Sequence, residues 1–451
     1  MKAITLCHVS FYFCDLEQKV TFMPLDTLYL ASKLRHEGFE IDFRDYQVAS
    51  MRYDDPQDTL HFASHFLRDA HDIVIVTCSN EALPVAIRGL DQFKELNPSK
   101  TVIFGGIGVA AVAREITRRF PRIDYVMAVD QGSKKAENSE LLYVNLVRSL
   151  MNDARPSSRV IYPALQPEGV GMNDSSSEPL LPAYDLVKLY DYDEVVARSA
   201  WGCPFLCSYC DRHRGRTVTW RSFDRLFEEL DFLAAHYQQK RIFFYDETFT
   251  LSRSRVKEFC NRVIKNNMSL SWTCTSRVDT IDEELLDLMA QAGCKMMFFG
   301  VESGSDSVLT RVKKGYDRQK AEQTLKLAGK YVYVATFFIW GFPFETMDDF
   351  HSTMDFVKQV QSWGGYPTLY AFSALPASTI CNEVVPLLKF DEEWWRTNWP
   401  QHFPKSAKQQ ELADFIRKNH SVFPGFYTSD PLAQEKLRVV KELNLETHFP
   451  E

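Results

Sequence analysis

Three cysteines stand at a spacing that could hold an iron–sulfur cluster. Cys203, Cys207 and Cys210 follow directly after the apolar stretch 195–200. A four-iron four-sulfur (4Fe-4S) cluster normally takes four thiolates, so a loop that offers three leaves one iron with an open coordination position. An open position on a metal is where substrates bind. The spacing therefore predicts redox chemistry at an incompletely ligated cluster.

The same cysteines allow a second interpretation. With His213 as a fourth ligand they would form a closed zinc site that only staples a loop. The chain would then be a non-catalytic zinc-stapled binding protein, colourless and free of sulfide. Zinc modules more often pair two-cysteine knuckles with a second, distant ligand pair, so we favour the cluster.

The cysteines belong to a half of the chain that alternates strand and helix patterns. Strand-like stretches cover 195–199, 241–245, 270–276, 295–300, 332–340 and 368–373. Apolar residues at helical spacing lie between them and complete six βα units. Because a full barrel has eight units, the pattern predicts a partial, open (β/α)6 barrel. Chemistry in such barrels lies on loops at the carboxyl ends of the strands, and the cysteines follow the first strand.

The first 135 residues show another alternation of strands and helices. Strand patterns cover 3–9, 40–44, 72–77, 101–104 and 125–128. Between them, apolar residues at helical spacing cover 25–36, 60–70, 84–95 and 110–119. This alternation predicts a Rossmann-like, doubly wound parallel sheet, whose ligands bind outside the carboxyl ends of the strands. The loops expected there carry Ser10, Cys78, Ser79, Asn80, Gly105, Gly106 and Ile107. They lack the Gly-x-Gly-x-x-Gly pattern that opens a helix, so a dinucleotide is not indicated.

Two further segments complete the expected domains. Residues 136–190 lose their periodicity after one helix and contain clusters of Pro, Ser and Gly, which are typical of a linker. Residues 386–451 form an aromatic-rich, helix-like C-terminal region. We expect this region to cap the open side of the barrel, with the lining of a substrate pocket as a second role. The expected domains are 1–135, the linker, the barrel over 191–385, and the C-terminal region.

The composition limits the partners and the location. A net charge of −8 argues against a broad nucleic-acid footprint, which needs clustered Lys and Arg. A small-molecule or peptide substrate is therefore expected. No apolar run approaches the ~20 residues of a membrane span, and the N-terminus lacks the pattern of a signal peptide. We expect a cytosolic protein without a membrane partner, whose ten cysteines are thiols or metal ligands.

Over residues 1–385 the chain resembles the radical S-adenosylmethionine (SAM) enzymes. It is most similar to the methyltransferase-like group, class B, whose N-terminal domain resembles a cobalamin-binding domain. Besides the cysteines, four stretches carry the resemblance: 244–249, 275–279, 299–304 and 338–346. The resemblance implies a 4Fe-4S cluster, SAM and cobalamin as cofactors, and an electron donor such as flavodoxin or ferredoxin.

The resemblance also implies roles for individual residues. The free iron would chelate SAM, and an electron from the cluster would cleave SAM to a 5′-deoxyadenosyl radical, which an apolar barrel shields from water. The expected SAM contacts are Asp246 and Glu247 at the amino group, Arg277 at the carboxylate, Glu302 near the ribose, and Ile339, Gly341 and Tyr209 at the adenine. The plainer interpretation of each acidic residue is a helix cap or a solvated turn. The loops that follow the N-terminal strands would contact cobalamin.

Three departures from the family pattern stand out. Phe344 replaces a glycine that family members often have near the cofactor pocket. Residues 125–132 replace the usual Gly-Glu-Gly turn that borders cobalamin, which leaves its binding open. No Asp-x-His-x-x-Gly occurs, so no lower-axial histidine of that kind is expected.

The leading hypothesis is a cobalamin-dependent radical SAM methyltransferase. By resemblance, one SAM methylates cobalamin, and a second yields the radical that prepares an unactivated carbon, or a phosphorus, of a small metabolite or peptide. The alternative keeps the radical without methyl transfer: a rearrangement, cyclisation or ring contraction, with the cobalamin domain in another role or empty. A tRNA-modifying enzyme is disfavoured by the acidic balance. No residue stands out as a general base or nucleophile.

Overall fold

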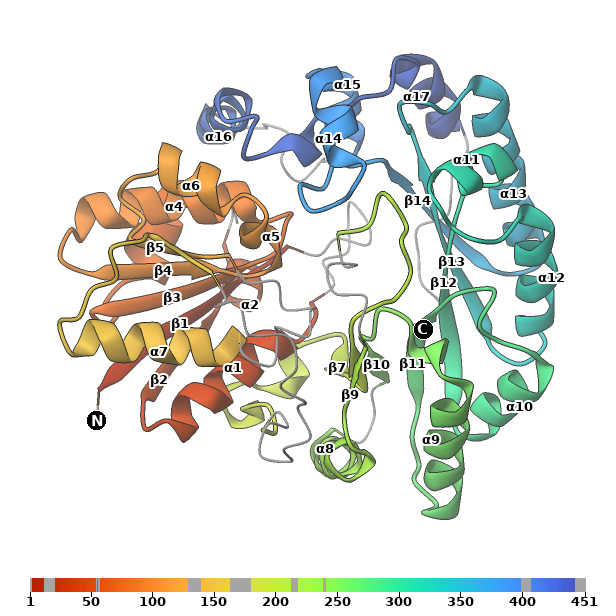
Figure 1. Ribbon diagram of the computed structural model, residues 1–451, viewed down its shortest axis with the longest axis horizontal. Helices are drawn as coiled ribbons and strands as arrows, with labels where there is room; N and C mark the ends of the chain where they lie inside the picture. The colour runs from red at the N-terminus through yellow and green to blue at the C-terminus, as the bar shows by residue number, and fades with distance from the viewer. Residues whose placement is uncertain are drawn as a thin grey trace. The chain divides into compact units, whose positions relative to one another are not determined.

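The computed structural model describes residues 2–11, 21–53, 55, 57–128, 139–162, 180–211, 218–237, 241–398 and 407–442. These residues form two compact units. The first unit contains the described residues up to 193 together with 407–423, and the second contains 194–398 together with 424–442. Each unit is built on one six-stranded sheet in which every pairing is parallel (Figure 1).

The first sheet has the strand order β2-β1-β3-β4-β5-β6. Its strands are β1 (Ala3–Val9), β2 (Glu40–Asp45), β3 (Ile73–Cys78), β4 (Thr101–Gly105), β5 (Tyr125–Met127) and β6 (Val160–Ile161). Every residue of β3 and β4 is buried, as expected for central strands covered on both faces. The direction of connection reverses at β1, between β2 and β3, and such a switch point is where ligands of open α/β sheets bind.

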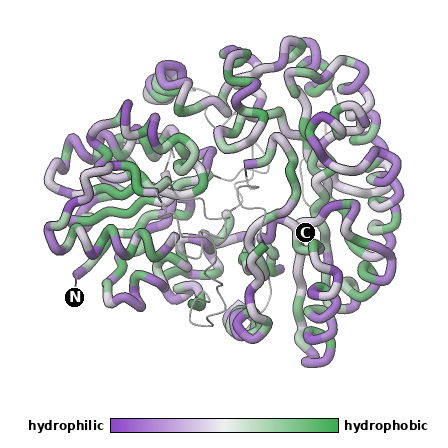
Figure 2. The backbone as a smooth tube through the Cα atoms, in the orientation of Figure 1, coloured by the Kyte–Doolittle hydropathy of each residue, from purple (hydrophilic) through white to green (hydrophobic). Residues whose placement is uncertain are grey.

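Helices cover both faces of this sheet. The helices α1 (Leu25–His36) and α7 (Ser139–Met151) lie on one face, and α4 (Leu83–Leu96) and α6 (Ala113–Arg119) lie on the other (Figure 1). The strands between them are the apolar part of the unit (Figure 2). The predicted doubly wound sheet is therefore confirmed.

Two details of the first unit differ from the sequence pattern. The expected helix over 60–70 is a short α3 (Thr59–His61) followed by a π-helical turn (Phe62–Phe66). The expected helix over 110–119 begins at Ala113 as α6, and a one-turn helix α5 (Ile107–Ala110) precedes it. The strand β6 lies inside the segment expected to be a linker. The expected domain boundaries at 135, 190 and 385 stay predictions.

The second sheet has the order β14-β13-β12-β11-β10-β7. Its strands are β7 (Val195–Ala197), β10 (Ile242–Phe244), β11 (Trp272–Ser276), β12 (Cys294–Glu302), β13 (Tyr333–Trp340) and β14 (Tyr366–Ala371). The helices between them are α8 (Phe223–His236), α9 (Arg253–Lys265), α10 (Glu283–Gln291), α11 (Asp306–Arg311), α12 (Arg318–Ala328) and α13 (Met347–Ser362). The helices α9, α10, α12 and α13 lie along the outer face of the sheet (Figure 1). The predicted partial barrel is confirmed.

Aromatic side chains line both faces of the barrel sheet. On the helix side, Phe244 packs edge-on against Phe259 of α9 with ring centroids 5.3 Å apart. Side chains alternate along a strand, so the neighbouring Phe243 points to the other face, where Phe298 and Phe337 stack at 5.6 Å. The inner face is therefore apolar, as the shielding of a radical requires.

The C-terminal region contributes helices to both units. They are α15 (Glu392–Asn398), α16 (Ala407–Lys418) and α17 (Ala433–Glu442), and the short α14 (Cys381–Val384) directly precedes the region. The helix α16 belongs to the first unit, where Phe415 contacts Phe120, whereas α15 and α17 belong to the second. Capping of the barrel by this region stays a prediction. Within the described ranges, none of the helices is long and apolar enough to cross a bilayer.

Candidate functional site

The three predicted cluster cysteines lie on the loop between the two short antiparallel strands β8 (Ala200–Trp201) and β9 (Thr219–Trp220). Cys207 is buried, and Cys203 and Cys210 are partly exposed. Burial raises the pKa of the Cys203 thiol, so this side chain is a neutral thiol at neutral pH. A coordinating thiol is deprotonated by its metal, so cluster assembly has to release this proton.

Zinc and a cubane cluster require different placements of their ligands. Among the residues that the structure describes, no three His, Cys, Asp or Glu side chains gather as a site for a metal ion. His213, the fourth ligand of the zinc interpretation, lies outside the described residues. A cubane makes a different demand, because its thiolates bind different irons. Three cysteines spread along one loop fit that demand.

Backbone hydrogen bonds fix the cysteine loop to the barrel unit. The N–H of Ser208 donates to the carbonyl of Val312, and the carbonyl of Ser208 accepts from the N–H of Ile380, both at 3.0 Å. A turn closes between the Cys210 N–H and the Cys207 carbonyl at 3.1 Å. The loop therefore has a defined position relative to the ends of β12 and β14.

The two carboxylates that follow β10 accept hydrogen bonds from the residues that lead into the cysteine loop. Asp246 is buried and accepts a hydrogen bond from the Ser199 N–H at 2.7 Å and another from the Ser199 hydroxyl. Burial raises the pKa of Asp246 to about 6. Glu247 accepts from the N–H of Gly202 at 3.1 Å. Both expected amino-group contacts are thus at the start of the loop, and their contact with SAM stays a prediction.

Arg277, at the end of β11, touches the cysteine loop directly. Its guanidinium binds both carboxylate oxygens of Asp279 at 2.9 Å and lies 3.7 Å from the ring centroid of Phe205. The Nη1 atom is a donor to Cys207 Sγ at 3.7 Å. The Nη2 atom also donates to the carbonyl of Lys314 at 2.5 Å. Arg277 therefore contacts the cysteine loop through Cys207 and Phe205, while its other donors bind Asp279 and Lys314, which the sequence pattern did not indicate.

Glu302, at the end of β12, is held by a buried lysine. Glu302 has a left-handed backbone with φ +72°, and its Oε1 accepts from Lys314 Nζ at 2.8 Å. The same ammonium donates to the Tyr209 hydroxyl at 3.1 Å. A Cβ at Gly300 would lie 2.6 Å from Glu302 Oε1, so the glycine of the Phe-Gly-Val-Glu-Ser-Gly stretch makes room for this pair.

Lys314 is a residue of the candidate site that the sequence analysis did not include. Although burial lowers its pKa, the charge of Glu302 raises it above the usual value, so the lysine is protonated. Burial raises the pKa of Tyr209 well above its usual value, so the phenol is neutral. The signal for Lys314 in the sequence is a Lys-Lys-Gly-Tyr turn, in which Lys314 stands twelve residues after Glu302. A turn of this kind is usually solvent-exposed, so it does not indicate a buried lysine.

The predicted adenine side is an apolar cluster. Tyr209, Ile339 and Phe344 pack around a buried core that includes Phe342 and Phe372. Phe344, the departure from the family pattern, stacks on Phe342 with ring centroids 5.4 Å apart. Gly341 follows β13 with φ +85°. The bulky side chain is thus accommodated by an aromatic neighbour, and the cluster suits a flat, apolar ring.

The expected cobalamin contacts meet at the carboxyl edge of the first sheet. The Ser10 hydroxyl donates to the Ser79 hydroxyl at 3.1 Å. Gly106 has φ +108°, and a Cβ there would lie 2.5 Å from the Cys78 backbone N and O atoms. Gly108 approaches the Ser79 carbonyl as closely, with a Cβ distance of 2.6 Å. Small, uncharged residues allow a backbone to approach a ligand closely, which suits a large ring cofactor. The altered turn at 129–132 lies outside the described residues.

One histidine at this edge, His8, is engaged by threonine hydroxyls of its own unit. His8 is half-buried, with its Nδ1 3.1 Å from the Thr27 hydroxyl and 3.3 Å from that of Thr77. Burial lowers the pKa of His8 to about 4. The ring is therefore neutral and hydrogen-bonded within the sheet.

Comparison with known proteins agrees with this arrangement. Residues 201–357 match the radical SAM superfamily, and residues 18–134 match the B12 binding domain. An uncharacterized methyltransferase of Pyrococcus horikoshii is 30% identical over 352 residues, which are 75% of this chain and 73% of that protein. The anaerobic magnesium-protoporphyrin IX monomethyl ester cyclase of Rubrivivax gelatinosus is 24% identical over 93% of this chain and 77% of that protein.

A solved structure shares the fold. The radical S-adenosylmethionine methyltransferase TsrM from Kitasatospora setae aligns with a TM-score of 0.65 and 18% identity over 86% of this chain and 76% of that chain. The matches favour neither the zinc-stapled binding protein nor a radical reaction without methyl transfer. The chain therefore belongs to the radical SAM superfamily as a cobalamin-dependent enzyme of the methyltransferase type, with a 4Fe-4S cluster, SAM and cobalamin as its cofactors.

Proposed function

We propose that the protein methylates an unactivated carbon, or a phosphorus, of a small metabolite or peptide. The observation that carries this proposal is the continuous set of buried groups that joins Cys207 to Arg277, and Lys314 to Glu302 and Tyr209. Buried ionisable groups that converge at the strand ends of a barrel are typical of an active site.

In this proposal Cys203, Cys207 and Cys210 hold the cluster, and other side chains each bind one part of SAM. Lys314 offers a buried cation for the SAM carboxylate, beside the remaining N–H of Arg277. Asp246 and Glu247 contact the amino group, and Glu302 contacts the ribose. Ile339, Gly341 and Tyr209 hold the adenine.

In the first unit, we propose that the small residues at the carboxyl edge hold the cobalamin. These residues are Ser10, Cys78, Ser79, Asn80, Gly105, Gly106 and Ile107. When bound, the cluster with SAM supplies a carbon-centred radical, and the cobalamin supplies a methyl group. The chain's own contribution is to orient the cofactors and to exclude water with the apolar inner face of the barrel.

The apolar inner face also supports a substrate with an apolar portion. Phe298 and Phe337 stack there, and Tyr370 lies 5.9 Å from Phe337 at the edge strand and is 49% exposed. The TsrM structure holds a tryptophan substrate, which has such a portion. The reaction also needs an electron from a donor such as flavodoxin or ferredoxin, and reduced thiols, which are conditions of the cytosol.

The test uses the reconstituted, cobalamin-loaded enzyme with a low-potential reductant and SAM labelled in its methyl group. Methylation predicts labelled product, with S-adenosylhomocysteine and 5′-deoxyadenosine formed together. Formation of 5′-deoxyadenosine with an unlabelled, rearranged product would contradict methyl transfer and support the alternative reaction. A Cys207→Ala variant treated in the same way is the blank.

A further inference from the structure

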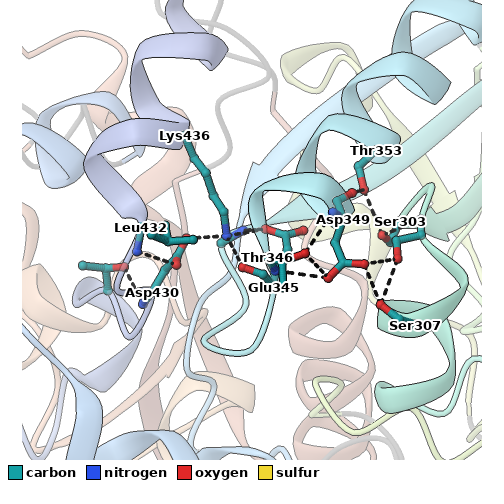
Figure 3. Close-up of polar contacts among 12 residues, drawn as sticks. Ser303, Ser307, Glu345, Thr346, Asp349, Thr353, Asp430, Leu432 and Lys436 are labelled. Atoms are coloured by element: carbon teal, nitrogen blue, oxygen red, sulfur yellow. Dashed lines mark hydrogen bonds and ion pairs between the residues drawn. The ribbon is translucent and has the colours of Figure 1, made fainter.

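The C-terminal helix α17 contributes a lysine to the interior of the second unit. Lys436 is fully buried, and its ammonium donates to the backbone carbonyl and to Oε2 of Glu345, both at 2.9 Å. It also forms an ion pair with Asp430 Oδ2 at 2.9 Å. An ammonium has three donors, and these three oxygens match that number (Figure 3).

This arrangement does more than attach the helix. The side chains of Lys436, Glu345 and Asp430 have no exposed surface, and burying charged groups is costly unless they are well paired. Apolar side chains such as Leu437 would fasten α17 without that cost. The charges therefore indicate a role in holding Glu345 itself.

Glu345 closes the loop that follows β13. Its Oε2, which accepts from Lys436, also accepts from the N–H of Gly341 at 2.8 Å. Its own N–H donates to the carbonyl of Phe342 at 3.0 Å. Gly341 has φ +85°. Because glycine has no Cβ, it can adopt this backbone conformation and many others, so a neighbouring contact has to fix one of them. The carboxylate held by Lys436 selects it.

The same chain of contacts continues to the loop after β12. Thr346, next to Glu345, caps α13 in a capping box with Asp349. Asp349 accepts from the hydroxyls of Ser305 and Ser307 at 2.5 and 2.6 Å. These serines follow Glu302 in the chain, so α17 and the loop after β12 are each hydrogen-bonded to one of the two neighbouring residues Glu345 and Thr346 or to the partner of that residue (Figure 3).

We propose that Lys436 is a positioning residue of the SAM site. Through Glu345 it fixes the backbone of Gly341, and so sets the affinity for SAM without touching the cofactor. The inference rests on the proposed function, in which Ile339 to Gly341 contact the adenine. It assigns the C-terminal helix to cofactor binding, a role beyond covering the barrel.

The experiment measures SAM binding to the full chain, with cluster and cobalamin loaded, by equilibrium dialysis that gives both Kd and the number of sites. Lys436→Met is compared with Lys441→Met, a matched control on the same helix whose ion pair with Glu393 is exposed. We expect Lys436→Met to raise Kd by about tenfold, the value of one well-placed hydrogen bond at its upper range. The number of sites and the iron per chain stay unchanged, and Lys441→Met behaves as the wild type.

A merely structural role predicts the opposite pattern. Lys436→Met would then lower the number of sites and the iron content, while the remaining sites keep the wild-type Kd, and that result overturns the proposal. If Lys436→Met is insoluble, Lys436→Arg keeps the charge but moves the donors; we expect an intermediate Kd, and a wild-type Kd overturns the proposal. Wild-type protein that binds no SAM would instead contradict the proposed function.

Discussion

The two units are each built on a parallel sheet and differ at the edge where ligands bind. Each has a six-stranded parallel sheet. At the carboxyl edge of the first sheet the groups in contact are hydroxyls and glycines, such as Ser10, Ser79 and Gly106. At the carboxyl edge of the second they are buried charges, such as Arg277 and Lys314.

The difference shows that the strand ends, and not the sheet, select the ligand. An edge of small side chains lets a large ring lie against the backbone. An edge of paired charges suits a small zwitterion, since each charge of the ligand meets a fixed partner. If each edge holds its own cofactor, we expect that one edge can be altered without loss of ligand binding at the other.

The largest expected effect is a complete loss of the iron–sulfur cluster without a loss of cobalamin. Cys207→Ala removes one of three thiolates, so iron and sulfide per chain should fall to background after reconstitution. Cobalamin bound per chain should stay at the wild-type value. Cys260→Ala, a buried cysteine in α9, is the control and should keep its iron. Loss of cobalamin together with iron would show that the two sites are not independent.

The next effect concerns the buried cation of the second edge. Lys314→Met leaves Glu302 buried without its partner, so SAM affinity should fall by about a hundredfold. The exposed neighbour Lys313, substituted to Met in the same way, is the control. Equal losses of affinity in both variants would contradict the assignment of Lys314 to SAM.

The first edge has a matched pair of glycines. Gly106→Ala places a Cβ 2.5 Å from the Cys78 backbone, whereas Gly38→Ala has a similar positive φ but open space around it. Gly106→Ala should weaken cobalamin binding by roughly tenfold, since the loop must shift, and both variants should keep wild-type iron. Unchanged cobalamin affinity in Gly106→Ala would count against this edge as the cobalamin site.

A smaller effect is expected at the hydrogen bond between Arg277 and Cys207. Hydrogen bonds to cluster sulfurs raise the reduction potential. Arg277→Gln should therefore lower the potential by roughly tens of millivolts, measured by a redox titration followed by electron paramagnetic resonance. Arg262→Gln, on the exposed side of α9, should leave the potential unchanged. A potential that rises in Arg277→Gln would refute the assigned hydrogen bond.

The smallest effect is a pH dependence of the first unit. Burial raises the pKa of Asp45 to about 7, so the folded state holds this proton more tightly than the unfolded state. Its stability contribution is therefore present below about pH 4 and is lost as the pH rises toward 7. Asp45→Asn should raise the unfolding temperature of this unit more at pH 8 than at pH 5. An equal change at both values would contradict the raised pKa.

The sequence was sufficient for most of the fold. Alternating apolar patterns predicted β1 and α1 with their observed bounds, because strand and helix periods differ clearly. The pattern missed β6, since two residues of strand in a weakly periodic segment give no period to detect. It also missed α5, because a helix of one turn is too short to show a helical period.

The site was predicted less completely, for a physical reason. Strand-end residues such as Asp246 and Glu302 are visible in the sequence because a strand pattern ends there. No strand pattern ends at Lys314 or Lys436, so the sequence does not single out these two lysines. Their partners lie 12 and 91 residues away in the chain, and only the folded barrel brings each lysine to its carboxylate.

The most direct test of this account is the content of iron, sulfide, zinc and cobalt per chain. It is measured after anaerobic reconstitution, incubation with hydroxocobalamin and desalting. The account predicts about four irons, four sulfides and one cobalt per chain. Iron and sulfide without cobalt would contradict the role of the first sheet edge, and zinc without sulfide would contradict the radical enzyme as a whole.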